Sequence, residues 1–140
     1  MPSSRFLFLN VGHSIDHLFM LMFPAVAALA AADLSASYGE VLKLATGSFI
    51  AFGVFSLPMG WLADRLSREF MMTVFFLGIG VAMILTGFSN EEWQIFVSLI
   101  LVGMFAAIYH PVGLAMVSQG GGDVGRRLGV NGVWGNMGVA

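Results

Sequence analysis

The sequence predicts an all-α integral membrane protein. Hydrophobic residues make up 58% of the 140 positions and charged residues only 10%, whereas a soluble domain carries about 25% charged residues. A chain of this length cannot bury so much apolar surface in one aqueous core. The apolar residues also occur in runs long enough to cross a bilayer, which takes roughly 20 residues. The excess apolar surface must therefore face lipid or other membrane helices.

Four such runs predict transmembrane helices over residues 6–31, 41–62, 71–88 and 93–117. They are read as helices because backbone groups in lipid must form their hydrogen bonds within the segment. The connections are short, so consecutive helices must run antiparallel. A fifth apolar segment starts at residue 128 and reaches about half of the spanning length by residue 140. We therefore expect the sequence to continue into a longer parent protein.

Basic residues predict the orientation of these spans, because they collect in cytoplasmic loops. One side of the membrane has a single basic residue, Lys43. The other side carries Arg5, Arg65, Arg68, Arg126 and Arg127. We expect a multi-pass protein of the cell (inner) membrane with a cytoplasmic N-terminus, in contact with the lipid bilayer. The first span is too long for a cleaved signal and contains Asp16, so we interpret it as a signal anchor.

Several functions are excluded by what the sequence lacks. It has no cysteine, which removes disulfides and thiolate metal sites. The glycine run at residues 120–122 follows no strand and lacks the lysine of a phosphate-binding loop, so nucleotide binding is rejected. No catalytic triad and no soluble domain are present. We expect no enzymatic activity, no cofactor and no nucleic-acid partner.

Polar residues inside the first span are the strongest functional signal. Asn10, His13, Asp16 and His17 are spaced by three and four residues, so they share one helical face. An ionised aspartate at the centre of a span costs roughly 2.5–3.5 kcal/mol, so such a residue faces the protein interior or a wet cavity. His110 in the fourth span lies at a matching depth, roughly 10 Å from the cytoplasmic edge at 1.5 Å per residue.

Three interpretations of this face remain open. The cluster could accept and release a proton or hold the polar part of a substrate, because histidine changes charge near neutral pH. His13, His17, Asp16 and His110 could instead bind a transition metal, for which imidazole is a suitable ligand. The structural alternative is a set of interhelical hydrogen bonds, each worth about 0.6 kcal/mol in membranes. We favour proton or substrate handling and expect no metal.

The loop between the second and third spans holds a second polar group. Gly60 would let a neighbouring helix approach closely. Asp64, Arg65 and Arg68 lie at the membrane edge, where a carboxylate can pair with a guanidinium or with a helix N-terminus. Such a group can act as a conformational latch that holds one state and releases it. Alternatively, the charges only cap the membrane edge and fix the topology.

This loop resembles the hallmark of the major facilitator superfamily, Gly-x-x-x-Asp-Arg/Lys-x-Gly-Arg-Arg/Lys. Gly60, Asp64, Arg65 and Arg68 match the pattern, whereas Ser67 replaces a glycine and Glu69 replaces a basic residue. The resemblance implies a twelve-helix fold of which this chain is the N-terminal half. Its first and fourth helices would line the central cavity, and the latch aspartate would contact the missing C-terminal half of the same chain.

Two further patterns resemble the branch of fosmidomycin-resistance-type exporters. They are the Gly12-His13-x-x-Asp16-His17 run with Pro24, and Tyr109-His110-Pro111. The fourth-span arginine typical of proton-coupled antiporters is missing. The resemblance implies a secondary active transporter of a small molecule, coupled to protons through alternating access and possibly an exporter. The alternatives are a non-transporting membrane module that binds a metal or a partner protein, and a small dimeric multidrug transporter.

Glycines recur every three residues in the fifth span, at Gly129, Gly132, Gly135 and Gly138. Small residues at an interface let helix backbones approach closely, so we expect this stripe to support helix packing. Pro24, Pro58 and Pro111 lie inside spans, where proline removes a backbone donor and kinks the helix.

Overall fold

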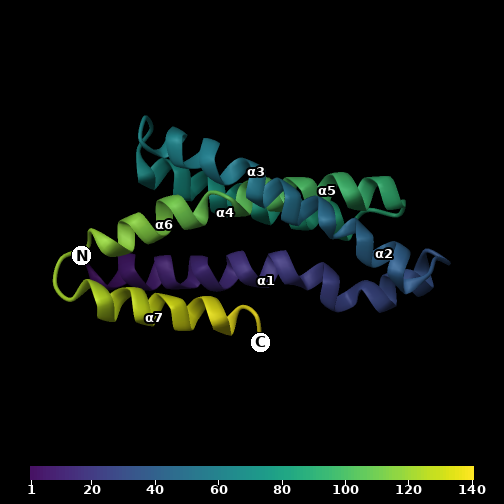
Figure 1. The fold of residues 1–140 in the computed structure, drawn as a ribbon, viewed down its shortest axis with the longest axis horizontal. Helices are drawn as coiled ribbons and strands as arrows, with labels where there is room; N and C mark the ends of the chain where they lie inside the picture. The colour runs from purple at the N-terminus through teal and green to yellow at the C-terminus, as the bar shows by residue number, and fades with distance from the viewer.

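The computed structural model describes residues 1–140, which form helices, turns and no strands (Figure 1). The helices are α1 (Ser3–Asp33), α2 (Tyr38–Leu44), α3 (Thr46–Ala63), α4 (Arg68–Gly87), α5 (Glu92–Ala106), α6 (Tyr109–Ser118) and α7 (Val124–Met137). Four helical stretches are long and apolar enough to cross a membrane: Ser3–Asp33, Tyr38–Ala63, Arg68–Gly87 and Glu92–Ser118. The predicted all-α fold class with four membrane-spanning helices is confirmed.

Two of the four stretches are interrupted. The second changes from α2 to α3 at Ala45, and the fourth changes from α5 to α6 at Ala107 and Ile108. Pro111 explains the second break, because it has no N–H to donate to the carbonyl four residues earlier, that of Ala107. Pro24 and Pro58, by contrast, lie within α1 and α3. The break before Pro111 is what starts α6 with Tyr109 and His110.

The helices pack as two groups joined by α6. Helices α3, α4 and α5 pack together, and α1 packs against α7 on the other side, with α6 contacting both groups (Figure 1). α7 starts beside the N-terminal end of α1 and runs in the same direction (Figure 1). The larger apolar core lies around Phe75 and Tyr109, and a second lies around Phe23 and Leu99. Many large apolar side chains remain exposed, as expected for surfaces that meet lipid or further helices.

Glycines allow two close helix contacts. A Cβ on Gly103 of α5 would overlap the backbone of Ser48 in α3, and a Cβ on Gly138 would overlap the backbone of Ser14 in α1. The four glycines of the predicted stripe do not share one face. Gly135 and Gly138 lie against α1, whereas Gly129 and Gly132 have open space at their Cβ positions. The reason is that a step of three residues falls about 60° short of a full turn, so the stripe winds around the helix.

Candidate functional site

The histidines and the aspartate singled out in the first and fourth spans lie together in the structure. α1 presents His13, Asp16 and His17 toward α6, whose first turn carries His110. The ring centroid of His13 lies 4.8 Å from that of His17 and 5.4 Å from that of His110. The ring centroids of His17 and His110 are 5.7 Å apart. Nδ1 of His110 is 3.4 Å from Oδ2 of Asp16. We call these four residues the His–Asp cluster.

Asp16 is the most deeply buried member of the His–Asp cluster, with 1% of its surface exposed. Its Oδ1 atom has no hydrogen-bond partner, and neither has Nδ1 of His110, although both atoms are buried. A buried polar atom without a partner costs free energy that a bound proton, ion or ligand can recover. The pair therefore has unused bonding capacity at the point where α1 and α6 meet.

One side of the His–Asp cluster opens into a cavity of about 250 Å³. Asp16, His17 and His110 supply its polar wall. Its other lining residues are Met20, Leu21, Phe49 and Phe52. The Phe52 ring meets His110 edge-on, with centroids 5.5 Å apart. The cavity thus combines a carboxylate and two imidazoles with an apolar wall, which is the usual make-up of a small-molecule site.

Two residues without a predicted site role complete the surroundings of the cluster: Tyr109, which the sequence analysis named only within the Tyr109-His110-Pro111 pattern, and Asn131. Tyr109 donates a 2.7 Å hydrogen bond to the carbonyl of Leu9 and stacks on His13 at a centroid distance of 4.9 Å. The backbone carbonyl oxygen of Asn131, in α7, lies at hydrogen-bond distance from Nδ1 of His13, 2.8 Å away. The available signals were that Tyr109 belongs to the same pattern as His110 and that Asn131 is an amide in a segment of mostly small and apolar residues. Asn10 bonds to Asn131 and lies outside the His–Asp cluster.

The three imidazoles are the residues best placed to hold a metal ion. One nitrogen from each of His13, His17 and His110 can be chosen so that all lie within 4.8 Å of one another. Three points at that separation lie about 2.8 Å from their centre, whereas a zinc–imidazole bond measures about 2.0–2.1 Å. Small ring movements would be needed to bind a metal, so the geometry admits this alternative without favouring it.

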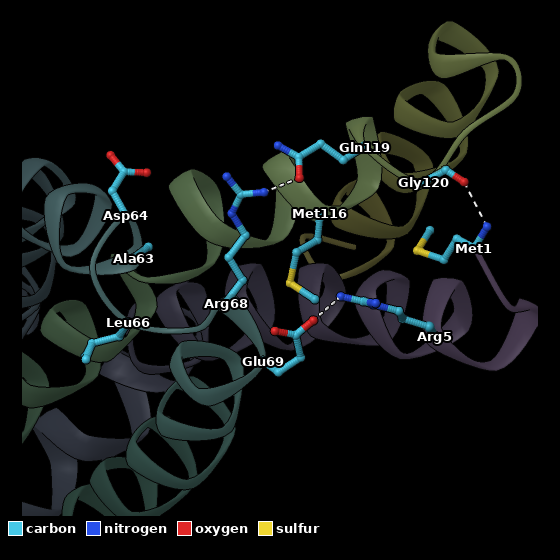
Figure 2. A pocket seen from close by; sticks show the side chains of 10 residues that line it. All are labelled: Met1, Arg5, Ala63, Asp64, Leu66, Arg68, Glu69, Met116, Gln119 and Gly120. Atoms are coloured by element: carbon cyan, nitrogen blue, oxygen red, sulfur yellow. Dashed lines mark hydrogen bonds and ion pairs between the residues drawn. The ribbon is translucent and has the colours of Figure 1, made fainter.

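The predicted latch residues do not pair with one another at the end of the bundle that carries the N-terminus (Figure 2). The Arg65 guanidinium lies 3.9 Å from the centroid of the Trp61 ring, and Arg68 donates to Gln119. Asp64 is exposed and its carboxylate forms no hydrogen bond or ion pair, and Figure 2 shows it apart from the other polar groups. A Cβ on Gly60 would make an ordinary contact with Pro111.

The two departures from the superfamily pattern both have structural roles. Ser67 caps α4 by accepting a hydrogen bond from the backbone N–H of Phe70 at 3.1 Å. Glu69 forms an ion pair with Arg5, which links α4 to the start of α1 (Figure 2). A basic residue at position 69 would repel Arg5, so the acidic residue adds a link between these helices. Arg5 and Glu69 border a cavity of about 530 Å³ that is also lined by Met1 and Gly120.

Comparison with known proteins identifies the family. The profile of the Major Facilitator Superfamily matches residues 11–140. The chain belongs to this superfamily. It is also 33% identical over 111 residues to the puromycin resistance protein pur8 of Streptomyces alboniger, an alignment that covers 77% of this chain and 22% of that protein. The chain thus spans about a fifth of that relative's length. No solved structure matches the chain.

Superfamily membership confirms the resemblance seen in the loop between the second and third spans. Together with the four apolar helical stretches, it makes this chain part of a multi-pass membrane protein in a family of membrane transporters. The fosmidomycin-resistance-type branch is not distinguished by these matches and stays a prediction.

Proposed function

We propose that these residues form the leading part of the N-terminal half of a secondary active transporter that exports a small amphiphilic molecule in exchange for protons. In this proposal the protein lies in the cell (inner) membrane with a cytoplasmic N-terminus, and the second half of the transporter closes the other side of the cavity. Membership of the superfamily supports transport, and the drug-resistance relative supports export.

The proton role is supported mainly by the pair of Asp16 and His110. Both are in membrane-spanning helices, and each has a buried atom without a hydrogen bond. A lone carboxylate in a membrane is costly when ionised, so it tends to take up a proton or pair with a cation. A proton on Asp16 removes the charge, whereas a proton on His110 creates an ion pair with Asp16. His17 extends the pair toward the cavity, and His13 lies on its other side.

The same cavity offers a place for the substrate. Phe49, Phe52 and Met20 provide an apolar wall opposite the titratable groups. A molecule with an apolar body and one polar group would use both parts of this lining. Proton and substrate would then compete for the His–Asp cluster. This competition would couple the movement of protons in one direction to the movement of substrate in the other.

The test is transport in proteoliposomes that contain the full-length protein. An imposed pH gradient, varied over about pH 5.5–8 where histidine changes charge, should drive accumulation of puromycin, chosen as the probe from the relative's name. Asp16→Asn should lose gradient-driven accumulation while retaining downhill movement. Asp33→Asn is the matched control, because Asp33 ends the same helix and is exposed. A flat pH profile together with full activity of Asp16→Asn would refute the proton role.

The second candidate function is a metal-binding membrane module, raised by the gathering of three imidazoles in one place. Titration with Co²⁺ separates it from the transporter, because histidine-bound cobalt has a characteristic visible spectrum. Tight Co²⁺ binding that is lost in His17→Gln, in a protein that moves neither protons nor puromycin, would replace the proposed function. Proton-driven transport that is unaffected by a metal chelator would support it.

We also propose that Gly60, Asp64, Arg65 and Arg68 act as the conformational latch. Asp64 supports this role because it is exposed and has no partner among the described residues, so it is available to a helix of the second half. Gly129 and Gly132 face open space on α7 and are available for close packing with that half, while Gly135 and Gly138 are used against α1.

A further inference from the structure

The hydrogen bond between α1 and α7 determines which nitrogen of His13 carries the proton. Nδ1 of His13 lies 2.8 Å from the backbone carbonyl oxygen of Asn131. A carbonyl only accepts hydrogen bonds, so Nδ1 must be the donor. In the neutral ring the lone pair is then on Nε2, which has no hydrogen-bond partner in the structure.

The His13 ring is also held on both sides. Tyr109 stacks on it with an interplanar angle of 22°. Gly135 of α7 lies against the ring, and a Cβ at this position would come within 2.7 Å of both Cε1 and Nε2. Since neither side leaves room for a large rotation, a ring flip that would exchange the two nitrogens is blocked while α7 stays in place.

The side chain of Asn131 fixes the position of the carbonyl that His13 uses. Its Nδ2 donates to Oδ1 of Asn10 at 2.9 Å and to the hydroxyl of Tyr109 at 3.0 Å. Asn131 is fully buried, with 0% of its surface exposed. One amide therefore ties α7 to both α1 and α6 beside His13, and it does not line the cavity.

We propose that Asn131 is a positioning residue that holds His13 as the Nδ1–H tautomer, so that Nε2 is the proton-accepting atom of the His–Asp cluster. This inference rests on the proposed proton-coupled transport. The titratable groups that face His13 come from α1 (Asp16 and His17) and α6 (Tyr109 and His110), and α7 contributes none. A proton on Nε2 converts the bond from Nδ1 into a charge-assisted one, which is stronger. Protonation of His13 therefore favours α7 docked on α1.

The tautomer can be measured directly by solid-state NMR of the ¹⁵N-histidine-labelled full-length protein in lipid bilayers. The His13 signals are identified by their loss in His13→Gln. In the wild type above neutral pH, Nδ1 should be protonated and Nε2 should not. Asn131→Leu should give a mixture of tautomers, and its proton-driven transport should fall toward that of His13→Gln. Asn136→Leu is the matched control, because Asn136 is an exposed amide on the same helix.

A second pair of variants keeps the test independent of Asn131→Leu, which could misfold. Gly135→Ala removes no hydrogen-bonding group but pushes the His13 ring away from the Asn131 carbonyl, whereas Gly132→Ala adds its methyl group to open space. Gly135→Ala should therefore give a mixture of His13 tautomers, and Gly132→Ala should not. A wild-type His13 protonated on Nε2, or an unchanged tautomer in both folded test variants, would overturn the inference. Absence of proton coupling in a wild type that shows the Nδ1–H tautomer would instead overturn the proposed function.

Discussion

Replacement of Gly103 by alanine should destabilise the bundle, because it adds a methyl group at the crossing of α3 and α5. The nearest atoms to the added Cβ belong to the backbone of Ser48, including its carbonyl. Backbone inside a helix cannot turn aside as a side chain can, so the two helices must separate. Gly78 and Gly80 of α4 provide a graded comparison. At Gly78 the methyl group meets the Phe105 ring, and at Gly80 it meets nothing within 4 Å.

The expected magnitude follows from two opposing effects. Overpacking of a well-packed interior costs typically about 1–3 kcal/mol. Alanine in place of glycine inside a helix gains roughly 0.5–1 kcal/mol. For Gly103→Ala the rigid neighbour places the cost at the upper end, which leaves a net loss of about 2 kcal/mol. Gly78→Ala should lose less, because the Phe105 ring can move, and Gly80→Ala should be neutral or slightly stabilising.

The assay is reversible unfolding in mixed micelles, in which the folded fraction of each variant is followed by circular dichroism as the SDS fraction increases. A net loss of about 2 kcal/mol reduces the folding equilibrium constant by more than tenfold, since each 1.4 kcal/mol is a factor of ten. The order of stability should be Gly80→Ala, then Gly78→Ala, then Gly103→Ala. If Gly103→Ala unfolds together with Gly80→Ala, the close crossing of α3 and α5 is wrong.

Two further predictions concern the end of the bundle that carries the N-terminus. The ion pair of Arg5 and Glu69 is solvent-exposed, with side-chain exposures of 45% and 64%. A double-mutant cycle with Arg5→Gln and Glu69→Gln should therefore give a coupling energy below about 1 kcal/mol, and this energy should fall when salt is added. A coupling that persists in high salt would contradict this. Asp64→Asn should leave the unfolding free energy of the 140-residue chain unchanged, because the Asp64 carboxylate has no partner in this chain. In the full-length transporter the same substitution should alter the balance of inward- and outward-facing states, measured by the labelling of single cysteines. Equal labelling of wild type and Asp64→Asn would argue that the loop only fixes topology.

The His–Asp cluster shows how far periodicity carries a sequence-based prediction. The spacing of His13, Asp16 and His17 requires them to share a face of one helix, whatever the rest of the chain does. The cost of a carboxylate in lipid predicts that this face is turned inward. That His110 joins them could be expected only from a matching depth and from the superfamily resemblance. The structure adds the distance of 3.4 Å to Asp16 and the two buried atoms without partners.

The glycines of the fifth span mark the opposite case. Their regular spacing predicted close helix packing without a partner, and a three-residue step drifts around a helix with 3.6 residues per turn. Only the packing of α7 on α1 determines that Gly135 and Gly138 are used and that Gly129 and Gly132 are left open. The break before α6 lies between these two cases. Pro111 in the sequence indicates that the fourth span is interrupted, but only the structure shows at which residues.

By itself the sequence determined the membrane-spanning helices, the superfamily and the polar face of the first span. The helices and the polar face depend on composition, run length or spacing within one segment, and the superfamily rests on the resemblance of one loop motif. Only the tertiary structure decided that Asn131 meets His13, 118 positions earlier, and that Tyr109 stacks on the same ring. In lipid, apolar burial does not select one helix pairing over another. Close packing and buried hydrogen bonds make that choice, and these depend on how all of the helices fit together.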